Sequence, residues 1–321
     1  MKLLIGGAAS MSDVPGLDAF PPRVDIHFAP DGDALRDALG GTEILLGWEL
    51  RGLDLETHWA RADNLRWIHL CRAGVDSLLF PALVDSDVEV TNARGIFDRA
   101  MAETVLGYLL AEAKGFRASW DMQKGHVWES RRSDCLENQC ALVVGVGSIG
   151  HAVGALLGAA GLRVQGIGRS ARDHDPVFGR IHGFGELKAL AGNADWVIGV
   201  LPSTAETRGI FDREFFSAMK PGARFVNIGR GDAQDEEALR EALETGALAG
   251  AMLDVFRTEP LPVDSPLWDT PNLFVSPHIS GDYHAFEEDL ARQFIDQLER
   301  YFNGQPLQNR VDKSIGYTVR P

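Results

Sequence analysis

Residues 141–150 read ALVVGVGSIG, an apolar run that ends in three glycines with the spacing G-x-G-x-x-G. The residues that follow, HAVGALLGAAG, have the composition of a helix. A strand, a tight glycine turn and a helix start together favour dinucleotide binding, because the helix N-terminus offers unpaired N–H groups and a favourable dipole to a pyrophosphate. A glycine-rich turn that binds nothing is the alternative. The predicted cofactor-binding residues of this loop are Gly145, Gly147, Ser148, Ile149 and Gly150.

Length, charge and cysteine content exclude several classes of protein. The 321 residues suffice for two domains, and the formal net charge of −15 disfavours a nucleic-acid partner, which needs a basic surface. Cys71, Cys135 and Cys140 are odd in number and lack metal-ligand spacing, so we expect no metal site, no disulfide framework and a cytoplasmic location. The short N-terminal apolar patch favours a first strand over a signal peptide, and no segment reaches the roughly 18 apolar residues of a membrane span.

Short apolar runs alternate with helix-like segments over the first 94 residues. This alternation predicts a parallel sheet covered on both faces. Helices are expected over residues 33–40 and 53–63, and a third after the turn at Ala73-Gly74, which is either a substrate contact or a plain turn. The predicted strands are KLLIG (2–6), RVDIHFA (23–29), TEILLGW (42–48), LRWIHLC (65–71) and VEVTNA (88–93).

One long helix is predicted over residues 99–120, and a polar, irregular connector over residues 121–139 follows it. Trp120 and Trp128 lie at and within this connector. Aromatic residues are enriched at subunit interfaces, so the two tryptophans predict such an interface. Ordinary packing within the chain is the alternative.

After the glycine loop the alternation resumes, which predicts a doubly wound sheet of Rossmann type. Further helices are expected over 213–220, 235–246 and 284–304, and an irregular tail over 305–321. The predicted strands are LRVQGIG (162–168), ADWVIGVL (194–201), ARFVNIG (223–229), ALAGAMLDV (247–255) and NLFVSP (272–277).

Three polar side chains directly follow strands of this second half. They are Arg230 in VNIGRGD, Glu259 in LDVFRTEP and His278 in FVSPHIS. The carboxyl ends of parallel strands meet at one edge of a sheet, so we expect these side chains to share that edge with a ligand on the glycine loop. An arginine can bind a carboxylate bidentately, a histidine can transfer a proton near neutral pH, and a glutamate can orient the histidine. Each residue alone is unremarkable in a loop; together they predict a catalytic site.

Seven segments carry a family resemblance. They are CRAGVD (71–76), MAETVLGYLL (101–110), VVGVGSIG (143–150), LPSTAETRGIF (201–211), VNIGRGD (226–232), GAMLDVFRTEPL (250–261) and SPHISG (276–281). With them the chain resembles the D-isomer-specific 2-hydroxyacid dehydrogenase family over nearly its whole length, in particular the glyoxylate/hydroxypyruvate reductase kind. The resemblance implies an α/β fold of two doubly wound parallel-sheet domains. A Rossmann NAD(P)-binding domain (99–282) would be inserted into a flavodoxin-like substrate-binding domain (1–98 and 283–321), with the active site in the cleft between them, in a homodimer.

The resemblance also implies an NAD(P)-dependent oxidoreductase with Arg230, Glu259 and His278 as its catalytic residues. Arg230 would bind the substrate carboxylate and polarise the carbonyl, and the reduced cofactor would deliver hydride. His278 would protonate the carbonyl oxygen while Glu259 accepts a hydrogen bond from it. Substrate contacts are implied for the backbone of Ala73, Gly74 and Val75, and cofactor contacts for Met101, Leu201, Pro202, Thr207, Ile228, Gly229 and Asp254.

The end of the second Rossmann strand departs from the pattern of NAD enzymes. Such enzymes carry an acid there for the ribose 2′-OH, but here Gly168 holds that place, and Arg169 and Ser170 follow it, with Arg172 nearby. A guanidinium and a hydroxyl can bind a 2′-phosphate. We therefore predict NADP(H) as the preferred cofactor and NAD(H) as the second choice; a merely solvated Arg169 is the alternative.

Two residues of the first half concern the substrate. Arg72 stands where the family more often has a small residue, and it could favour acidic substrates or pair with an acid such as Asp76. Trp48 could face the substrate and set the accepted side-chain size, or pack in the core or at an interface.

The sequence thus predicts NADPH-dependent reduction of a small 2-oxo acid, of the glyoxylate or hydroxypyruvate type, to the D-2-hydroxy acid. The expected partners are this small molecule and a second copy of the chain, with no nucleic acid and no membrane. Two alternatives stay open: a non-catalytic, NAD(P)-sensing protein like the corepressors of this family, and a short D-3-phosphoglycerate dehydrogenase.

Overall fold

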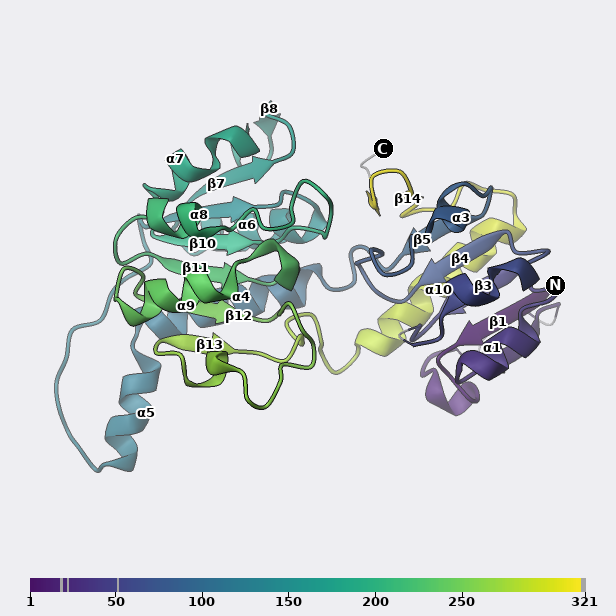
Figure 1. Ribbon diagram of the computed structural model, residues 1–321, viewed down its shortest axis with the longest axis horizontal. Helices are drawn as coiled ribbons and strands as arrows, with labels where there is room; N and C mark the ends of the chain where they lie inside the picture. Colours follow the sequence, from purple (N-terminus) through teal and green to yellow (C-terminus); the bar gives the residue numbers. More distant parts are fainter. Residues whose placement is uncertain (18–19, 22, 51, 319–321) are drawn as a thin grey trace. The chain divides into compact units, whose positions relative to one another are not determined.

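The computed structural model describes residues 1–17, 20–21, 23–50 and 52–318. The chain forms two compact units, one of Met1–Phe97 with Tyr283–Pro321 and one of Asp98–Asp282. Each unit is built on its own largely parallel sheet (Figure 1). The predicted fold class, two doubly wound α/β domains with one inserted into the other, is confirmed. The assignment of the first unit to substrate binding stays a prediction.

The first unit contains a five-stranded parallel sheet in the order β2-β1-β3-β4-β5. This is the strand order of flavodoxin-like folds. The strands are β1 (Lys2–Gly6), β2 (Asp25–Ala29), β3 (Ile44–Gly47), β4 (Trp67–Leu70) and β5 (Glu89–Asn92). Successive side chains of a strand point to opposite faces. Leu4 therefore packs into the core on one face and Leu3 into the core on the other, and both are fully buried.

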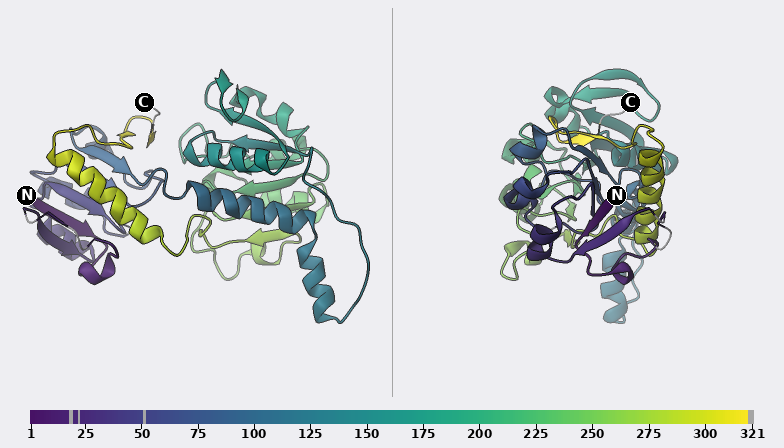
Figure 2. Two further views of the ribbon diagram at one scale, coloured as in Figure 1. Left: turned by 180° about the vertical axis from the view of Figure 1, so that it is seen from behind. Right: turned by 90° about the vertical axis from the view of Figure 1, so that its right-hand side faces the viewer.

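Helices cover both faces of this sheet. The last long helix, α10 (Phe286–Phe302), lies along one face (Figure 2). Its Phe294 stacks on Trp67 of β4 with ring centroids 5.4 Å apart. The short helices α1 (Gly32–Ala38), α2 (Leu55–His58) and α3 (Pro81–Val84) contribute Leu35, Leu55 and Leu83 to the opposite core. The 3-10 turns of this unit are Met11–Asp13 and Trp59–Arg61.

Two predictions for the first unit are wrong. No helix follows directly after Ala73-Gly74, because residues 75–80 form turns that bury Val75 and Leu78 in the core, and the next helix begins only at Pro81. Proline disfavours the helical conformation for the residue that precedes it, which explains why the helix begins at Pro81 and not earlier. The tail is not wholly irregular: β14 (Val311–Asp312) and β15 (Tyr317–Thr318) form an antiparallel pair. Residues 319–321 of that predicted tail lie outside the described residues.

The second unit contains an eight-stranded sheet in the order β13-β12-β11-β10-β6-β7-β9-β8. All neighbouring strands pair in parallel except β8 and β9. The strands are β6 (Cys140–Val144), β7 (Arg163–Gly168), β8 (Arg172–Asp175), β9 (Gly179–Gly183), β10 (Trp196–Gly199), β11 (Arg224–Asn227), β12 (Gly250–Leu253) and β13 (Leu273–Val275). The glycine-loop strand β6 is fully buried at the centre, and the strand order reverses beside it, where dinucleotides bind in such folds.

The helices of the second unit are α4 (Asp98–Ala113), α5 (Phe116–Lys124), α6 (Ser148–Ala159), α7 (Leu187–Ala191), α8 (Arg213–Ala218) and α9 (Glu236–Glu244). The 3-10 turns are Phe184–Glu186, Gly231–Ala233 and Pro266–Asp269. Helix α6 opens directly after the glycine loop, as predicted. Helix α4 packs closely on α6 on one face of the sheet (Figure 2).

Two further predictions for the second unit need correction. The predicted helix over 99–120 is two helices, because Gly115 adopts a left-handed φ of +63° between α4 and α5, which turns the chain. The sequence did not predict β8 and β9. These strands are short, polar and mostly exposed at the edge of the sheet, so they lack the apolar alternation that identifies a strand.

A cluster of phenylalanines fills one core of the second unit. Phe211, Phe215, Phe216 and Phe225 are each at most 3% exposed, and the ring of Phe225 lies 5.1 Å from that of Phe211 and 5.2 Å from that of Phe216. Edge-to-face contacts of this kind stabilise beyond the area that the rings bury.

We expect the substitution Phe225→Ala to lower the free energy of unfolding of the second unit by about 3–5 kcal/mol, because it leaves a cavity that the surrounding rings cannot fill. Urea unfolding followed by circular dichroism measures this loss. Phe274→Ala is the matched control, since Phe274 is 47% exposed and should lose at most about 1 kcal/mol. Equal losses in the two variants would contradict this account of the core.

Candidate active site

The glycine loop has the shape that a pyrophosphate requires. A Cβ on Gly150 would overlap the carbonyl oxygen of Gly145, so glycine is needed there for α6 to approach β6. A Cβ on Gly147 would meet no atom within 4 Å, so the backbone of Gly147 faces open space at the N-terminus of α6. An anion can lie there against the helix N-terminus. The loop therefore fits a dinucleotide.

Two side chains of α6, Ser148 and His151, fix this loop through hydrogen bonds. The hydroxyl of Ser148 donates a hydrogen bond to the carboxylate of Asp98, the first residue of α4. On the next turn of α6, the two ring nitrogens of His151 lie 2.7 Å from the carbonyl oxygen of Gly147 and 2.8 Å from a carboxylate oxygen of Asp175. Sequence reasoning missed Asp98, His151 and Asp175, because their partners are distant in the sequence.

Asp175 is a buried carboxylate that also faces an arginine. Burial raises its pKa, but hydrogen bonds from His151 and from the backbone N–H groups of residues 177 and 178 outweigh this and hold the pKa below its usual value. Nη2 of Arg172 lies 3.8 Å from Oδ2 of Asp175. The ionised Asp175 thus connects the glycine loop to the strand that carries Arg172.

The end of β7 holds the residues that predict the choice of cofactor. A Cβ on Gly168 would lie 2.8 Å from Cγ2 of Val146, so an acidic side chain has no room at this position. Arg169 follows, half-exposed, and its Nε lies 3.2 Å from Oε2 of Glu206. Ser170 is exposed beside it.

The loop after β10 packs closely on the loop after β11. A Cβ on Gly229 would lie 2.6 Å from the backbone nitrogen and oxygen of Leu201, so only glycine permits this contact. The hydroxyl of the buried Thr207 donates to the carbonyl of Pro202 at 2.6 Å and accepts from the N–H of Thr204 at 2.9 Å. These bonds close the turn between residues 202 and 207.

The other predicted cofactor contacts belong to the same unit. Ile228 is buried between β11 and Gly229. Met101 on α4 and Ile149 on α6 are partly buried and pack on the core between these two helices and the sheet. Their contact with a cofactor stays a prediction.

Arg230 lies just past the end of β11, in a loop that Asn227 shapes. The side-chain amide of Asn227 donates to the carbonyl of Arg230 at 2.9 Å and to the side chain of Gln234 at 2.8 Å, and its oxygen accepts from the N–H of Gly229 at 2.9 Å. Asn227 and Gln234 are at most 2% exposed. Sequence reasoning missed both, although a polar side chain at the end of a buried strand is a signal that could have found them.

His278 and Glu259 meet, as the sequence predicted. Nδ1 of His278 lies 2.7 Å from Oε2 of Glu259, and the side chains are 34% and 30% exposed, so solvent or a ligand reaches them. The other carboxylate oxygen of Glu259 accepts the N–H of Phe256 at 2.9 Å. One carboxylate oxygen of Glu259 is therefore fixed by the backbone, and the other orients the ring of His278.

Asp254 stabilises the turn that carries His278 through hydrogen bonds. It is fully buried, and it accepts hydrogen bonds from the hydroxyl of Ser276 at 2.6 Å and from the N–H groups of Ile279 at 2.9 Å and Ser280 at 3.1 Å. His278 itself has a φ of +58°, a left-handed conformation that non-glycine residues rarely adopt. Such conformations persist where surrounding bonds impose them. The predicted contact of Asp254 with the nicotinamide carboxamide is untested.

In the first unit, the loop after β4 contains three successive backbone N–H groups that suit an anion, those of Ala73, Gly74 and Val75. Asn92 of β5, 4% exposed, donates to the carbonyl of Ala73 at 2.6 Å and so fixes the loop. Within the described part of the chain, the N–H groups of Ala73, Gly74 and Val75 donate hydrogen bonds to no backbone carbonyl. A run of such N–H groups suits a carboxylate. Asn92 is a further residue that the sequence did not single out.

The two residues of the first unit that concern the substrate have different surroundings. Arg72 is partly exposed and interacts with neighbouring groups. Trp48 is partly buried and packs against the core that α10 covers. Its role in setting substrate size stays a prediction.

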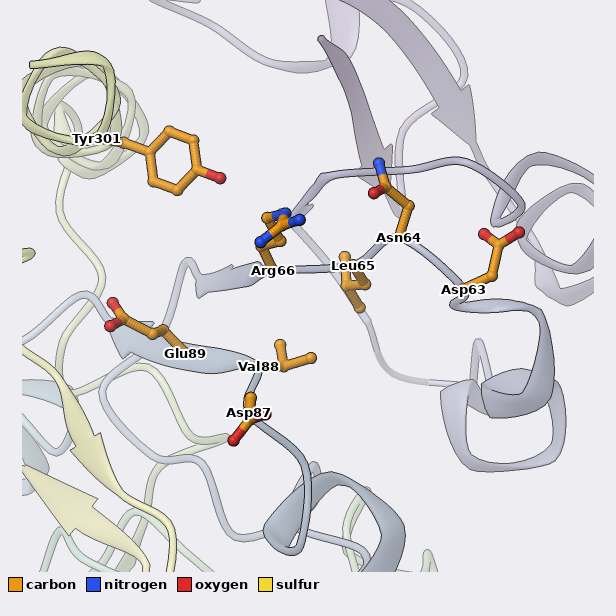
Figure 3. A pocket seen from close by; sticks show the side chains of 8 residues that line it. All are labelled: Asp63, Asn64, Leu65, Arg66, Asp87, Val88, Glu89 and Tyr301. Carbon is orange, nitrogen blue, oxygen red and sulfur yellow. The ribbon is translucent and has the colours of Figure 1, made fainter. Parts of the chain in front are cut away.

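A hollow in the first unit lies away from these residues (Figure 3). It is lined by residues 63–66, residues 87–89 and Tyr301, at the amino ends of β4 and β5. Ligands of open α/β sheets bind at the carboxyl ends, so this hollow is not the active site. Among the described residues, no cluster of side chains could hold a metal ion, and none of the described helices is long and apolar enough to cross a membrane.

The chain is similar to proteins of one known family. Residues 106–280 match the model of the NAD-binding domain of D-isomer-specific 2-hydroxyacid dehydrogenases. The chain is 34% identical over 260 residues to glyoxylate/hydroxypyruvate reductase B of Pectobacterium atrosepticum, covering 79% of this chain and 81% of the relative.

Two solved structures resemble the whole chain. One is an NADPH-dependent glyoxylate/hydroxypyruvate reductase from Sinorhizobium meliloti in complex with NADP and sulfate, with a TM-score of 0.86, 29% identity and coverage of 98% of this chain and 99% of that one. The other is a D-isomer-specific 2-hydroxyacid dehydrogenase from Xanthobacter autotrophicus in complex with NADPH and MES, with a TM-score of 0.84, 30% identity and coverage of 98% and 100%. The chain therefore belongs to the D-isomer-specific 2-hydroxyacid dehydrogenase family, whose members are nicotinamide-dependent oxidoreductases.

Proposed function

We propose that this protein uses NADPH to reduce a small 2-oxo acid, of the glyoxylate or hydroxypyruvate type, to the D-2-hydroxy acid. The observation that carries the proposal is the His278–Glu259 pair, 2.7 Å apart past the carboxyl ends of the sheet that also bears the glycine loop. The relative from P. atrosepticum and the neighbour from S. meliloti are both named glyoxylate/hydroxypyruvate reductases, which supports the substrate class.

The proposed mechanism assigns one task to each side chain. When bound, the reduced nicotinamide supplies the hydride that adds to C2 of the 2-oxo acid. His278 donates Nδ1–H to Glu259, so Nε2 is the atom that gives a proton to the carbonyl oxygen. The guanidinium of Arg230 binds the substrate carboxylate and polarises the carbonyl. Hydride on carbon and proton on oxygen together give the hydroxy acid.

The first unit would contribute to substrate binding through its backbone. The N–H groups of Ala73, Gly74 and Val75 lie in a loop that Asn92 fixes, and they can donate hydrogen bonds to a carboxylate without rearrangement. Arg72 beside them would favour substrates with a further negative charge.

We expect His278→Asn to lower kcat/KM with glyoxylate and hydroxypyruvate by about 10²- to 10⁴-fold, because a positioned proton donor contributes that much. Glu259→Gln should lower it less and should change its dependence on pH, since the amide can still accept the N–H of Phe256 but carries no charge. Steady-state kinetics with a panel from glyoxylate to phenylpyruvate and 3-phosphohydroxypyruvate measure both effects.

The same assay decides between the alternatives. Activity confined to 3-phosphohydroxypyruvate would indicate a phosphoglycerate dehydrogenase, and no oxidation of NADPH with any 2-oxo acid would indicate a sensor. Unchanged turnover in His278→Asn would contradict the mechanism. Thermal unfolding of each variant shows whether it retains its fold.

The proposed preference for NADPH depends on the end of β7. Gly168 leaves no room for an acid, and Arg169 and Arg172 supply two positive charges. Two structural neighbours are in complex with NADP and NADPH, which agrees with this choice.

We expect the wild-type protein to bind NADPH at least tenfold more tightly than NADH, and Arg169→Gln to remove most of that difference by weakening NADPH alone. A charged hydrogen bond of this type is worth about 1.5–3 kcal/mol, or roughly 10- to 100-fold in Kd. Fluorescence titration with each nucleotide measures the two constants. Tighter binding of NADH by the wild-type protein would contradict the cofactor assignment.

The proposed homodimer depends on an arm of the second unit, which we define as α5 and the irregular segment 125–135. Figure 1 shows this arm extending from the rest of its unit. Its apolar side chains are uncovered: Trp120 is 62% exposed and Trp128 is 102% exposed, so packing within the chain is wrong for Trp128. Arg131 folds the segment back onto α5 by donating to the carbonyl of Gly115 and to Ser119, which fixes the shape of the arm. A second copy would bury these tryptophans.

We expect the wild-type protein to sediment with twice the mass of one chain, and the double substitution Trp120→Ala/Trp128→Ala to shift it toward the monomer, because large aromatic residues dominate the energy of interfaces. Sedimentation equilibrium measures the change. Trp268→Ala is the control, since Trp268 is 50% exposed in the same unit but outside the arm. A dimer unaffected by the double substitution would exclude the arm as the interface.

A further inference from the structure

A carboxylate contacts the arginine that we propose as the ligand of the 2′-phosphate of the cofactor. Oε2 of Glu206 lies 3.2 Å from Nε of Arg169, the residue proposed to bind that phosphate. Both side chains are about half exposed, at 51% for Arg169 and 55% for Glu206, so the pair is open to an approaching ligand. A 2′-phosphate bound to the same guanidinium would lie close to this carboxylate, and the two negative charges would repel each other.

Glu206 reaches Arg169 from a loop whose shape is fixed. It lies in the turn between residues 202 and 207, which the hydroxyl of Thr207 closes through the carbonyl of Pro202 and the N–H of Thr204. Thr207 is 4% exposed. The backbone of this turn therefore holds Glu206 near the end of β7, while its side chain remains free to rotate into solvent.

The second arginine of the site has a different acidic partner. Arg172 lies 3.8 Å from Asp175, whose carboxylate is 2% exposed and bound by His151 and two backbone N–H groups. Asp175 cannot turn away when a phosphate arrives, because these bonds hold it in the protein. Among the residues that the structure describes, none holds the Glu206 carboxylate with bonds of this kind, so Glu206 is the acid whose interaction a phosphate can replace.

Glu206 also places an acidic side chain near the end of β7, where the strand itself has none. Side chains at position 168 are excluded by Val146 and Ile181, so the usual acid for a ribose 2′-OH has no room there. The carboxylate of Glu206 approaches the same region from the neighbouring loop.

We propose that Glu206 modulates cofactor specificity, because its carboxylate competes with a 2′-phosphate for Arg169. This competition weakens the binding of NADPH and so reduces the preference of the protein for NADPH over NADH. This inference rests on the proposed NADP(H) site. Surface ion pairs of this exposure contribute at most about 1 kcal/mol, so the effect on Kd is about fivefold or less. Glu206 thus tunes the cofactor preference that Arg169 establishes.

The test is titration of NADPH and NADH against wild type, Glu206→Gln, Arg169→Gln and the double variant, at one low ionic strength. Glu206→Gln should bind NADPH about three- to fivefold more tightly and should bind NADH no more tightly than wild type. In the Arg169→Gln background the same substitution should have no effect on NADPH, because the shared guanidinium is gone. Raising the salt concentration should reduce the gain.

Glu214→Gln is the matched control. Glu214 forms an exposed ion pair with Lys188 at 2.6 Å in the same unit, so this variant loses the same charge away from the cofactor site. It should leave both constants unchanged. An equal gain in NADPH binding in this control would show a long-range charge effect and would overturn the proposal.

The outcomes separate this inference from the cofactor assignment. If Arg169→Gln leaves NADPH binding unchanged, the proposed 2′-phosphate site is wrong. If Arg169→Gln weakens NADPH but Glu206→Gln leaves the ratio of the two constants as in wild type, only the role of Glu206 is wrong. A parallel change for both nucleotides in Glu206→Gln would indicate a role in loop structure alone and would also overturn it.

Discussion

Buried polar side chains that bind loop backbone hold together the edge of the second sheet where the candidate active site lies. Asn227 fixes the loop of Arg230, and Asp254 fixes the turn of His278. Both lie at strand ends inside an apolar core, where an unpaired polar group would be costly, so each makes several hydrogen bonds. The positions of the exposed residues of the site therefore depend on buried groups beneath them.

This arrangement explains how a histidine can be presented in a strained conformation. Left-handed φ values disfavour residues with a Cβ, yet His278 adopts one, because three hydrogen bonds to Asp254 hold the turn around it. The ring then meets Glu259, whose other oxygen is fixed by the backbone of Phe256. The orientation of His278, the proposed proton donor, is thus set without a substrate, and such positioning is what the proposed mechanism requires.

The sequence could predict the sheets and the exposed ends of the site, but not the residues that support them. Apolar runs identified every central strand, since burial on both faces requires them. The strands β8 and β9 at the edge of the sheet are polar and lack such runs, so the sequence did not predict them. The glycine loop and the His278–Glu259 pair follow from local motifs at strand ends. Asn92, Asn227, Asp175 and Glu206 escaped detection, because their importance arises from contacts between loops that only the folded chain brings together.

The end of β7 shows how packing constrains recognition. Val146, within the glycine loop, and Ile181, on β9, fill the space beside position 168, so a side chain there would crowd both of them. Charge for or against a 2′-phosphate must then come from residues beyond the strand, on the β7–β8 connection and on the turn after β10. The residues that carry these charges, Arg169 and Glu206, are exposed. If these residues control the binding of the 2′-phosphate as proposed, a change of their charge alters cofactor choice without disturbing the packing of α6 on β6.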